Sequence, residues 1–193
     1  MATRNGKTLL SRHDWARAAL DAIGEGGIGA VTVDDLAGRL GATRGSFYWH
    51  FTDRAAVIEE ALELWARENT NERLPALEAI ADPRKRLRAL RKAVYEEPAD
   101  APELTLSCAG DDPIAAPVFA RVTKRRMRVL QRIFTDLGFS DTEAANRSWL
   151  AYAFYLGHHQ LRKNADLAAP GRERLERMLA VLTECAQPEH RER

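Results

Sequence analysis

Residues 43–51 gather hydroxyl, guanidinium, imidazole and aromatic side chains in one short stretch, Thr-Arg-Gly-Ser-Phe-Tyr-Trp-His-Phe. Phe47 and Phe51 are four residues apart, so they share one face of a helix. Tyr48 and Trp49 must then point away from that face. The outward side carries hydrogen-bond donors, positive charge and aromatic rings, which are the groups that contact phosphates and base edges in nucleic acids.

Two short helices joined by a tight turn are expected to position these side chains. Thr32 is placed to cap a first helix with an apolar face, and Gly41 suits the left-handed residue that ends it. Thr43 is placed to cap a second helix, about residues 44–50, which is too short to persist alone. This arrangement is a helix-turn-helix, whose second helix enters the major groove of DNA.

The pattern Leu-Ala-x-x-Leu-Gly at residues 36–41, followed by Arg-Gly-Ser-Phe-Tyr-Trp-His-Phe and Asp-Arg, resembles the N-terminal signature of the tetracycline-repressor (TetR) family. The resemblance covers residues 11–65, and the rest of the chain shares only the all-helical character of the family. It implies a dimeric transcriptional repressor that a ligand releases from DNA. It also implies contacts to base edges or phosphates from Thr32, Thr43, Arg44, Gly45, Ser46, Tyr48, Trp49, His50 and Arg54.

Arg44 is the first candidate for base recognition, because a guanidinium discriminates best in favour of guanine N7 and O6. Gly45 would let the backbone approach DNA closely. Thr43 is expected to cap its helix whatever else it does, and Tyr48 or Trp49 could instead cover the end of another helix. We expect DNA contact, because aromatic, hydroxyl and basic groups share one side of so short a helix.

Net charge gives no support of its own to DNA binding. The chain has a net charge of +1, and residues 1–54 hold seven Lys or Arg against six Asp or Glu. Asp34 and Asp35, where some TetR-family members carry a basic residue, would repel phosphate, although their first-turn position also suits the helix dipole. A basic face would have to bring together Arg4, Lys7, Arg12, Arg44 and Arg54.

The residues before the motif are expected to form an arm, a helix and a turn. Residues 1–10 are polar and predict a disordered arm or, alternatively, a minor-groove contact. Ser11 and Asp14 predict the capped start of a helix that braces the motif. Residues 24–29 match GxGxxG, but they follow a helix and not a strand, so we expect a turn with several positive-φ residues and no dinucleotide site.

The sequence predicts an all-α fold with two domains. Residues 1–53 form the helix-turn-helix DNA-binding domain, and residues 54–193 form a helical ligand-binding and dimerisation domain. Asp53 caps the joining helix, which in the TetR family conveys the effect of the ligand to the DNA-binding domain. Helices are expected at about 54–69, from 83 to a break at 96–102, and at 103–109, 118–137, 140–163 and 170–185.

The sequence contains no HExxH, GxSxG, P-loop or paired-cysteine zinc motif. His158 and His159 are adjacent and face different directions on a helix, which argues against a shared metal ion. We therefore expect no enzyme, no cofactor and no metal site.

The resemblance implies a small apolar or aromatic effector, bound among the C-terminal helices. Such sites are apolar cavities with a few polar groups, so aromatic side chains and one histidine are the candidates. They are Trp65, Tyr95, Phe119, Trp149, Tyr152, Tyr155 and His158. For each of them the alternative is an ordinary place in the core.

The helix at 140–163 is apolar or small on nearly all sides, so it should be buried on more than one side. The resemblance implies that the last two helices pair with their copies in a homodimer, and a dimer also suits a palindromic operator. Two alternatives stay open. One is a regulator that binds DNA constitutively without a ligand, and the other is a helical enzyme or protein-interaction module that no longer contacts DNA.

Cys108 and Cys185 are too few and too far apart for a disulfide framework, and both are expected to pack in the interior. The N-terminus lacks the apolar core of a secretory signal, and no apolar run approaches the roughly 18 residues of a membrane helix. These features predict a soluble cytoplasmic protein with no membrane partner.

Overall fold

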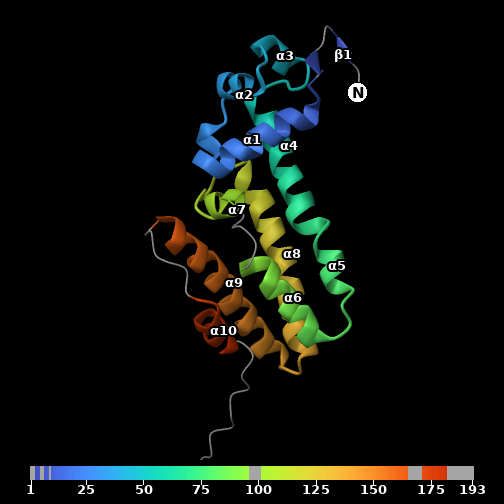
Figure 1. The fold of residues 1–193 in the computed structure, drawn as a ribbon, viewed down its shortest axis with the longest axis vertical. Coiled ribbons are helices and arrows are strands. Elements are labelled where there is room, and N and C mark those ends of the chain that lie inside the picture. Colours follow the sequence, from blue (N-terminus) through green and yellow to red (C-terminus); the bar gives the residue numbers. More distant parts are fainter. Residues whose placement is uncertain (1–2, 5–6, 9, 96–100, 165–170, 182–193) are drawn as a thin grey trace, which may run out of the picture. The chain divides into compact units, whose positions relative to one another are not determined.

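The structure is a computed structural model that describes residues 3–4, 7–8, 10–95, 101–164 and 171–181. Its architecture is all-α, as predicted (Figure 1). The α-helices are α1 (Arg12–Gly26), α2 (Val33–Leu40), α3 (Arg44–Tyr48), α4 (Arg54–Ala66), α5 (Leu74–Glu78), α6 (Pro83–Tyr95), α7 (Ala101–Leu106), α8 (Ala115–Asp136), α9 (Asp141–Asn164) and α10 (Arg172–Ala180).

Four further elements complete the described chain. A 3-10 turn, η1 (Ile28–Ala30), follows α1, and a π-helical turn, η2 (Arg67–Asn71), continues α4. The predicted N-terminal arm contains two-residue strands, β1 (Thr3–Arg4) and β2 (Lys7–Thr8), which pair antiparallel. No described helix has the length and hydropathy to cross a membrane.

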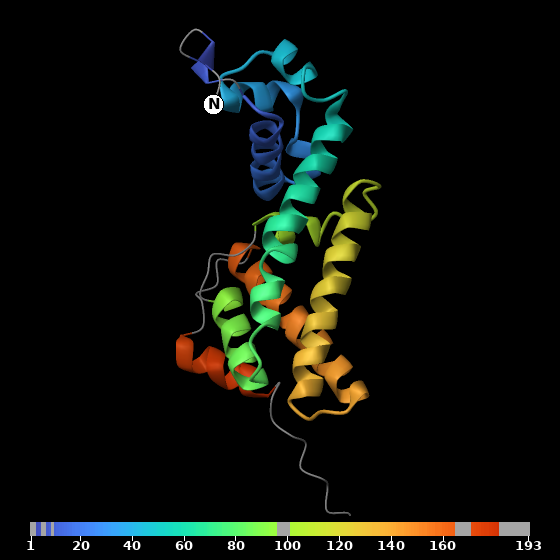
Figure 2. The same cartoon turned by 90° about the vertical axis from the view of Figure 1, so that its right-hand side faces the viewer.

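The chain divides into two compact units, Met1–Val129 and Leu130–Arg193, which we describe separately. The division falls inside α8. The predicted domain boundary between residues 53 and 54 stays a prediction, although α4, which begins at Arg54, packs along α1 in the first unit (Figure 2).

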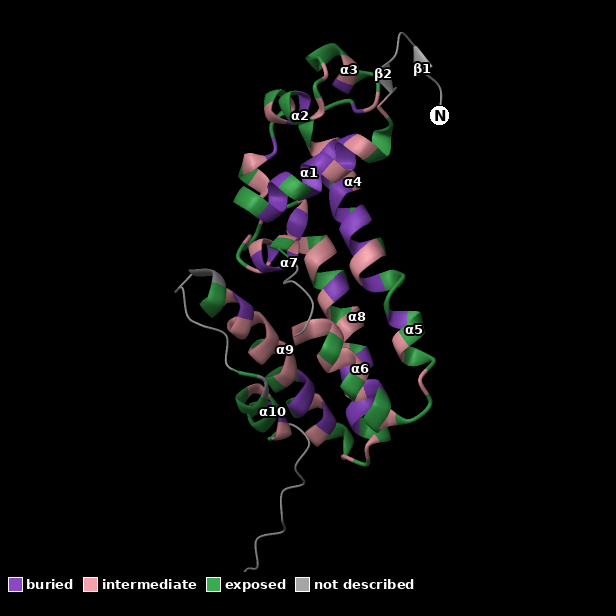
Figure 3. Ribbon diagram, viewed as in Figure 1, coloured by how far each residue is buried: buried purple, intermediate pink, exposed green. Residues whose placement is uncertain are grey.

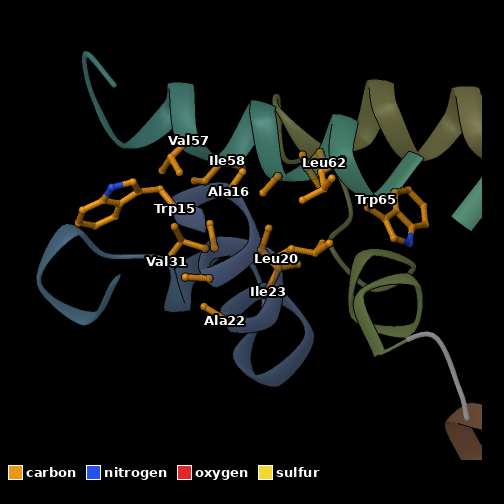
Figure 4. Packing of buried hydrophobic residues seen from close by; sticks show 14 of the residues in the cluster. Trp15, Ala16, Leu20, Ala22, Ile23, Val31, Val57, Ile58, Leu62 and Trp65 are labelled. Atoms are coloured by element: carbon orange, nitrogen blue, oxygen red, sulfur yellow. The ribbon is translucent and has the colours of Figure 1, made fainter. Parts of the chain in front are cut away.

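The core of the first unit lies between α1 and α4 (Figure 3). Trp15 and Ile23 of α1 and Ile58 and Trp65 of α4 are fully buried, with the two tryptophan rings at opposite ends of the cluster (Figure 4). The predicted capping box starts α1: the Asp14 carboxylate accepts from the Ser11 amide at 2.7 Å, and the Ser11 hydroxyl accepts from the Asp14 amide. Local hydrogen bonding and an apolar stripe thus explain this helix.

The glycine-rich turn differs from its prediction. Among residues 24–29 only Gly27 has a positive φ, of 80°. Gly24 lies inside α1, where an added Cβ would come within 3.2 Å of the Pro102 ring. Glycine at position 24 is therefore explained by the close packing of α1 against α7 and not by backbone conformation.

Several helix limits and burial assignments also differ. The segment predicted as 103–109 is helical only over α7, and α8 starts before 118 because the Asp112 carboxylate accepts from the amides of Ile114 and Ala115. Cys108 is exposed, which corrects its predicted interior position. Cys185 and the end of the last predicted helix lie outside the described residues.

The second unit contains α9, α10 and the end of α8. Arg147 of α9 lies over the Phe139 ring at 4.1 Å and donates to the Val181 carbonyl at 3.1 Å, so it connects α9 to the chain that follows α10. Trp149 and Leu150 are exposed in the single chain, 71% and 59%. The prediction that a partner subunit covers the second side of this helix stays a prediction.

A buried ion pair joins α7 to α8. Glu103 and Arg126 approach to 2.5 Å, and their side chains are 1% and 14% exposed. The Arg126 guanidinium also donates to the Thr70 hydroxyl at 3.0 Å and to the Asn69 carbonyl at 3.2 Å. This pair was not predicted, although Arg126 stands between Val122 and Val129 on the apolar stripe of α8, a position where a charge needs a buried partner.

Glu103→Ala should lower the free energy of unfolding by about 3–5 kcal/mol, because it leaves the buried guanidinium of Arg126 without its counter-charge. Glu103→Gln should cost less, since it keeps a hydrogen-bond acceptor. Urea unfolding measures both. The matched control is Glu173→Ala, which breaks the exposed pair with Arg177 and should change stability by less than about 1 kcal/mol. Equal losses in the two Ala variants would contradict a structural role for the buried pair.

Candidate nucleic-acid interface

The short helix α3 is held by its two phenylalanines. Phe47 is completely buried and meets the Trp15 ring edge-on at 5.4 Å, and it stacks with Phe51 at 5.6 Å. The predicted cap is present, since the Thr43 hydroxyl accepts from the Ser46 amide at 3.2 Å. α3 ends at Tyr48 and not at His50, and a tight turn continues to Phe51.

The outward side of α3 is open, as predicted. Tyr48 is 54% exposed and Trp49 is 89% exposed, so Trp49 does not cover the end of another described helix. Thr43, Arg44 and Gly45 are also exposed, while Ser46 and His50 are half-buried. The structure therefore brings the hydroxyl, basic and aromatic groups of this segment onto one accessible surface.

The helix before the turn has the expected ends. The Thr32 hydroxyl accepts from the Asp35 amide at 3.1 Å, and Gly41 ends α2 with a φ of 59°. At Gly45 an added Cβ would lie 3.7 Å from the Thr43 hydroxyl oxygen, which is an ordinary contact. Nothing among the described residues therefore requires glycine at position 45.

Two arginines of the expected basic face bind the protein itself. Arg54 donates through Nε to the Val31 carbonyl at 2.6 Å and also donates to the Ile28 carbonyl. Arg12 lies over the Phe51 ring at 4.1 Å and pairs with Glu60 at 2.8 Å. Their guanidinium groups are held within the helix-turn-helix, and the contribution of these two residues to a basic face stays a prediction.

The remaining charges around α2 are arranged in pairs. The Arg44 guanidinium lies 3.3 Å from the Asp34 carboxylate. Arg39 pairs with Asp35 at 2.6 Å and with Glu25 at 2.8 Å, and its hydrogen bonds hold the pKa of the Glu25 carboxyl below its usual value. The side chains of Arg4 and Lys7 lie outside what the structure describes.

The candidate ligand residues fall into both units. In the first unit, Trp65 stacks almost parallel to Phe119 at 6.3 Å, and burial raises the pKa of the Tyr95 hydroxyl. In the second unit, the rings of Tyr152 and Tyr155 are 6.1 Å apart on α9. His158 lies on the same helix, where burial and then the neighbouring His159 lower its pKa, and Trp149 is exposed.

A depression of about 320 Å³ in the first unit was not predicted. It lies between η1 and the chain around α7 and contains none of the seven candidate ligand residues. Its lining consists of Gly27, Ile28, Gly29, Thr105, Leu106, Cys108, Ala109 and Asp112. Within the described residues, no three His, Cys, Asp or Glu side chains gather in a way that could hold a metal ion.

Known proteins share both the sequence of the motif and the fold. Residues 16–61 match the family described as bacterial regulatory proteins, tetR family. Over 68 residues the chain is 35% identical to the tetracycline repressor protein class A from transposon 1721 of Escherichia coli, a match that covers 35% of this chain and 32% of the relative. The chain thus aligns with about a third of that relative's length.

Solved structures share the fold over most of the chain. A transcriptional regulator from Rhodococcus has a TM-score of 0.71 at 23% identity, with 90% of this chain and 94% of that chain covered. A protein from Saccharomonospora viridis, solved in complex with choline, has a TM-score of 0.69 at 20% identity, with 89% and 92% covered. The N-terminal helix-turn-helix therefore carries the signature of the TetR family of bacterial regulatory proteins, and the chain shares the fold of solved transcriptional regulators.

Proposed function

We propose that the protein binds a palindromic operator as a homodimer, represses transcription from it, and is released by a small molecule. The observation that carries the proposal is the exposed polar and aromatic side of α3, whose opposite side is buried. A docked recognition helix with exposed donors suits a major groove. Because the DNA of a bacterium lies in the cytoplasm, the protein would act there.

The proposed contacts divide by their surroundings. Arg44, Gly45 and Ser46 would face base edges, with Tyr48, Trp49 and His50 near phosphates or bases. Thr32 and Thr43 already cap helices, and their hydroxyls would contact DNA from those positions. Arg54 would support the motif through its two carbonyl contacts, with any phosphate contact made beside them.

The proposed dimer uses the last two helices. Exposed large apolar side chains of the second unit are Trp149, Leu150, Leu161, Met178 and Val181. Leu150 and Leu161 are eleven residues apart, so they share one face of α9 with Gly157. An added Cβ at Gly157 would meet nothing within 4 Å, which leaves room for a helix of a second copy. An exposed apolar face of this kind typically marks an interface.

The proposed release acts through α4. Its first residue, Arg54, holds the turn before α2, and Trp65 near its other end stacks on Phe119 of α8. A ligand that shifts the Trp65 end of α4 would therefore move the elements that position α3, and it would favour a spacing that no longer fits two major grooves. The effector would be small and apolar or aromatic, and the candidate residues of each unit are the positions to test for its binding.

Neighbouring proteins support a small-molecule effector. The Saccharomonospora viridis protein was solved with choline, and the multidrug binding protein EbrR was solved with imidazole. EbrR has a TM-score of 0.61 at 19% identity, with 92% of this chain and 97% of that chain covered. A compound that raises the melting temperature and also releases DNA would separate this proposal from a regulator that binds DNA constitutively.

Selection of duplexes from a random-sequence library should enrich one palindromic site. Arg44→Ala should weaken binding to that site by about 1–3 kcal/mol and relax the preference at one base pair in each half, because a bidentate base contact is lost. Gel-shift titration measures both effects. Arg132→Ala, on the exposed side of α8, is the control and should bind normally. Failure of the wild-type protein to enrich any duplex would overturn the proposed function.

Gly45→Ala should separate folding from DNA binding. The free energy of unfolding should stay constant or rise by up to about 1 kcal/mol, since alanine favours helix and the added Cβ has room. Operator affinity should fall by about 1–3 kcal/mol if the backbone approaches DNA closely. Gly38→Ala, exposed and unobstructed in α2, is the matched control and should leave affinity unchanged. Unchanged operator affinity in Gly45→Ala would rule out this close approach.

Leu161→Glu should convert the dimer to a monomer, because it places an unpaired charge in the proposed interface. Sedimentation velocity measures the change in mass. Ala120→Glu, at an exposed position of α8, is the control and should remain dimeric. A Leu161→Glu protein that keeps the wild-type mass would show that this face of α9 is not the interface.

A further inference from the structure

Asp34 of α2 and Arg44 of α3 meet across the turn of the helix-turn-helix. Arg44 Nη1 lies 3.3 Å from Oδ1 and 3.4 Å from Oδ2 of Asp34, and the two side chains are 63% and 71% exposed. An acidic group thus stands beside the guanidinium that is expected to recognise DNA. Asp35 occupies the same first turn and can interact with the helix dipole, so that role alone does not explain Asp34.

We propose that Asp34 determines the specificity of DNA recognition by positioning Arg44. Asp34 holds Nη1 and leaves the edge formed by Nε and Nη2 for the base. The Asp34 carboxylate also offsets part of the guanidinium charge, so Arg44 gains less from a phosphate at an arbitrary sequence. This inference rests on the proposed function, since it concerns how the same surface discriminates between DNA sequences.

Non-specific and sequence-specific DNA complexes respond differently to such an ion pair. Non-specific binding depends on basic side chains that neutralise phosphates, and an Arg already paired with a carboxylate contributes less to it. Recognition of guanine depends on two hydrogen bonds in a fixed orientation, which a held guanidinium retains. Asp34 should therefore reduce affinity for random sequences more than affinity for the operator.

The charges around Asp34 allow a clean comparison. Asp35, the next residue, accepts from Arg39 Nε at 2.6 Å, and Glu25 holds Nη1 and Nη2 of the same arginine at 3.0 and 2.8 Å. Asp35→Asn thus removes one negative charge from the same turn of α2 without removing a contact to Arg44. Asp34→Asn removes the same charge and also the ion pair with Arg44.

The test compares these variants on the duplex selected by the wild-type protein and on a scrambled duplex of equal composition. Asp34→Asn should lower the ratio of the two affinities by at least about fivefold, mainly through tighter binding of the scrambled duplex. For the scrambled duplex, the slope of log affinity against log salt concentration should steepen in this variant by up to about 0.9 for each added phosphate contact. Asp35→Asn should keep the ratio within about twofold of wild type.

A double-mutant cycle assigns the effect to Arg44. In an Arg44→Ala background, Asp34→Asn should no longer relax the preference at the base pair that Arg44 recognises. Equal losses of discrimination in Asp34→Asn and Asp35→Asn, or a loss that persists without Arg44, would overturn the proposal. These outcomes require wild-type protein that binds its selected duplex, so they are distinct from failure of the wild-type protein to select DNA, which would overturn the proposed function itself.

Discussion

The contact between Phe47 and Trp15 is the interaction on which the exposed surface of α3 depends. α3 has five residues, and a helix of that length does not persist in water without tertiary packing. The edge-on contact with Trp15 at 5.4 Å and the stacking with Phe51 supply that packing. Because both phenylalanines point inward, Tyr48 and Trp49 are forced outward, so one buried cluster sets both the stability of α3 and the composition of its exposed side.

Within the first unit, α4 links that cluster to α8. α1 packs along α4, and Arg54 joins the start of α4 to the carbonyls before α2. At the other end of α4, Trp65 stacks on Phe119, close to the buried Glu103–Arg126 pair, whose guanidinium lies 5.6 Å from the Trp65 ring. One continuous helix, α4, therefore connects the surroundings of this pair to the elements that hold α3.

Electrostatics explains how a nearly neutral chain can carry a DNA-binding motif. Arg12, Arg39 and Arg54 bind carboxylates or carbonyls of the protein, so their main effect is on the geometry of the motif. Arg44 is exposed but stands beside Asp34. Such an arrangement gives up part of the sequence-independent attraction to phosphate, and recognition then depends more on the shape and hydrogen bonds of the base edges.

The sequence by itself determined the helix caps and the two sides of α3. Ser11, Thr32, Thr43 and Asp53 bond to amides three residues away, and the spacing of Phe47 and Phe51 sets one face, so both features depend on local geometry alone. Only the tertiary structure decided the partners of Arg12 and Arg54, the fit of Gly24 against Pro102 and the Glu103–Arg126 pair. These contacts join residues 23 to 78 positions apart, and no local periodicity specifies which distant segments pack together.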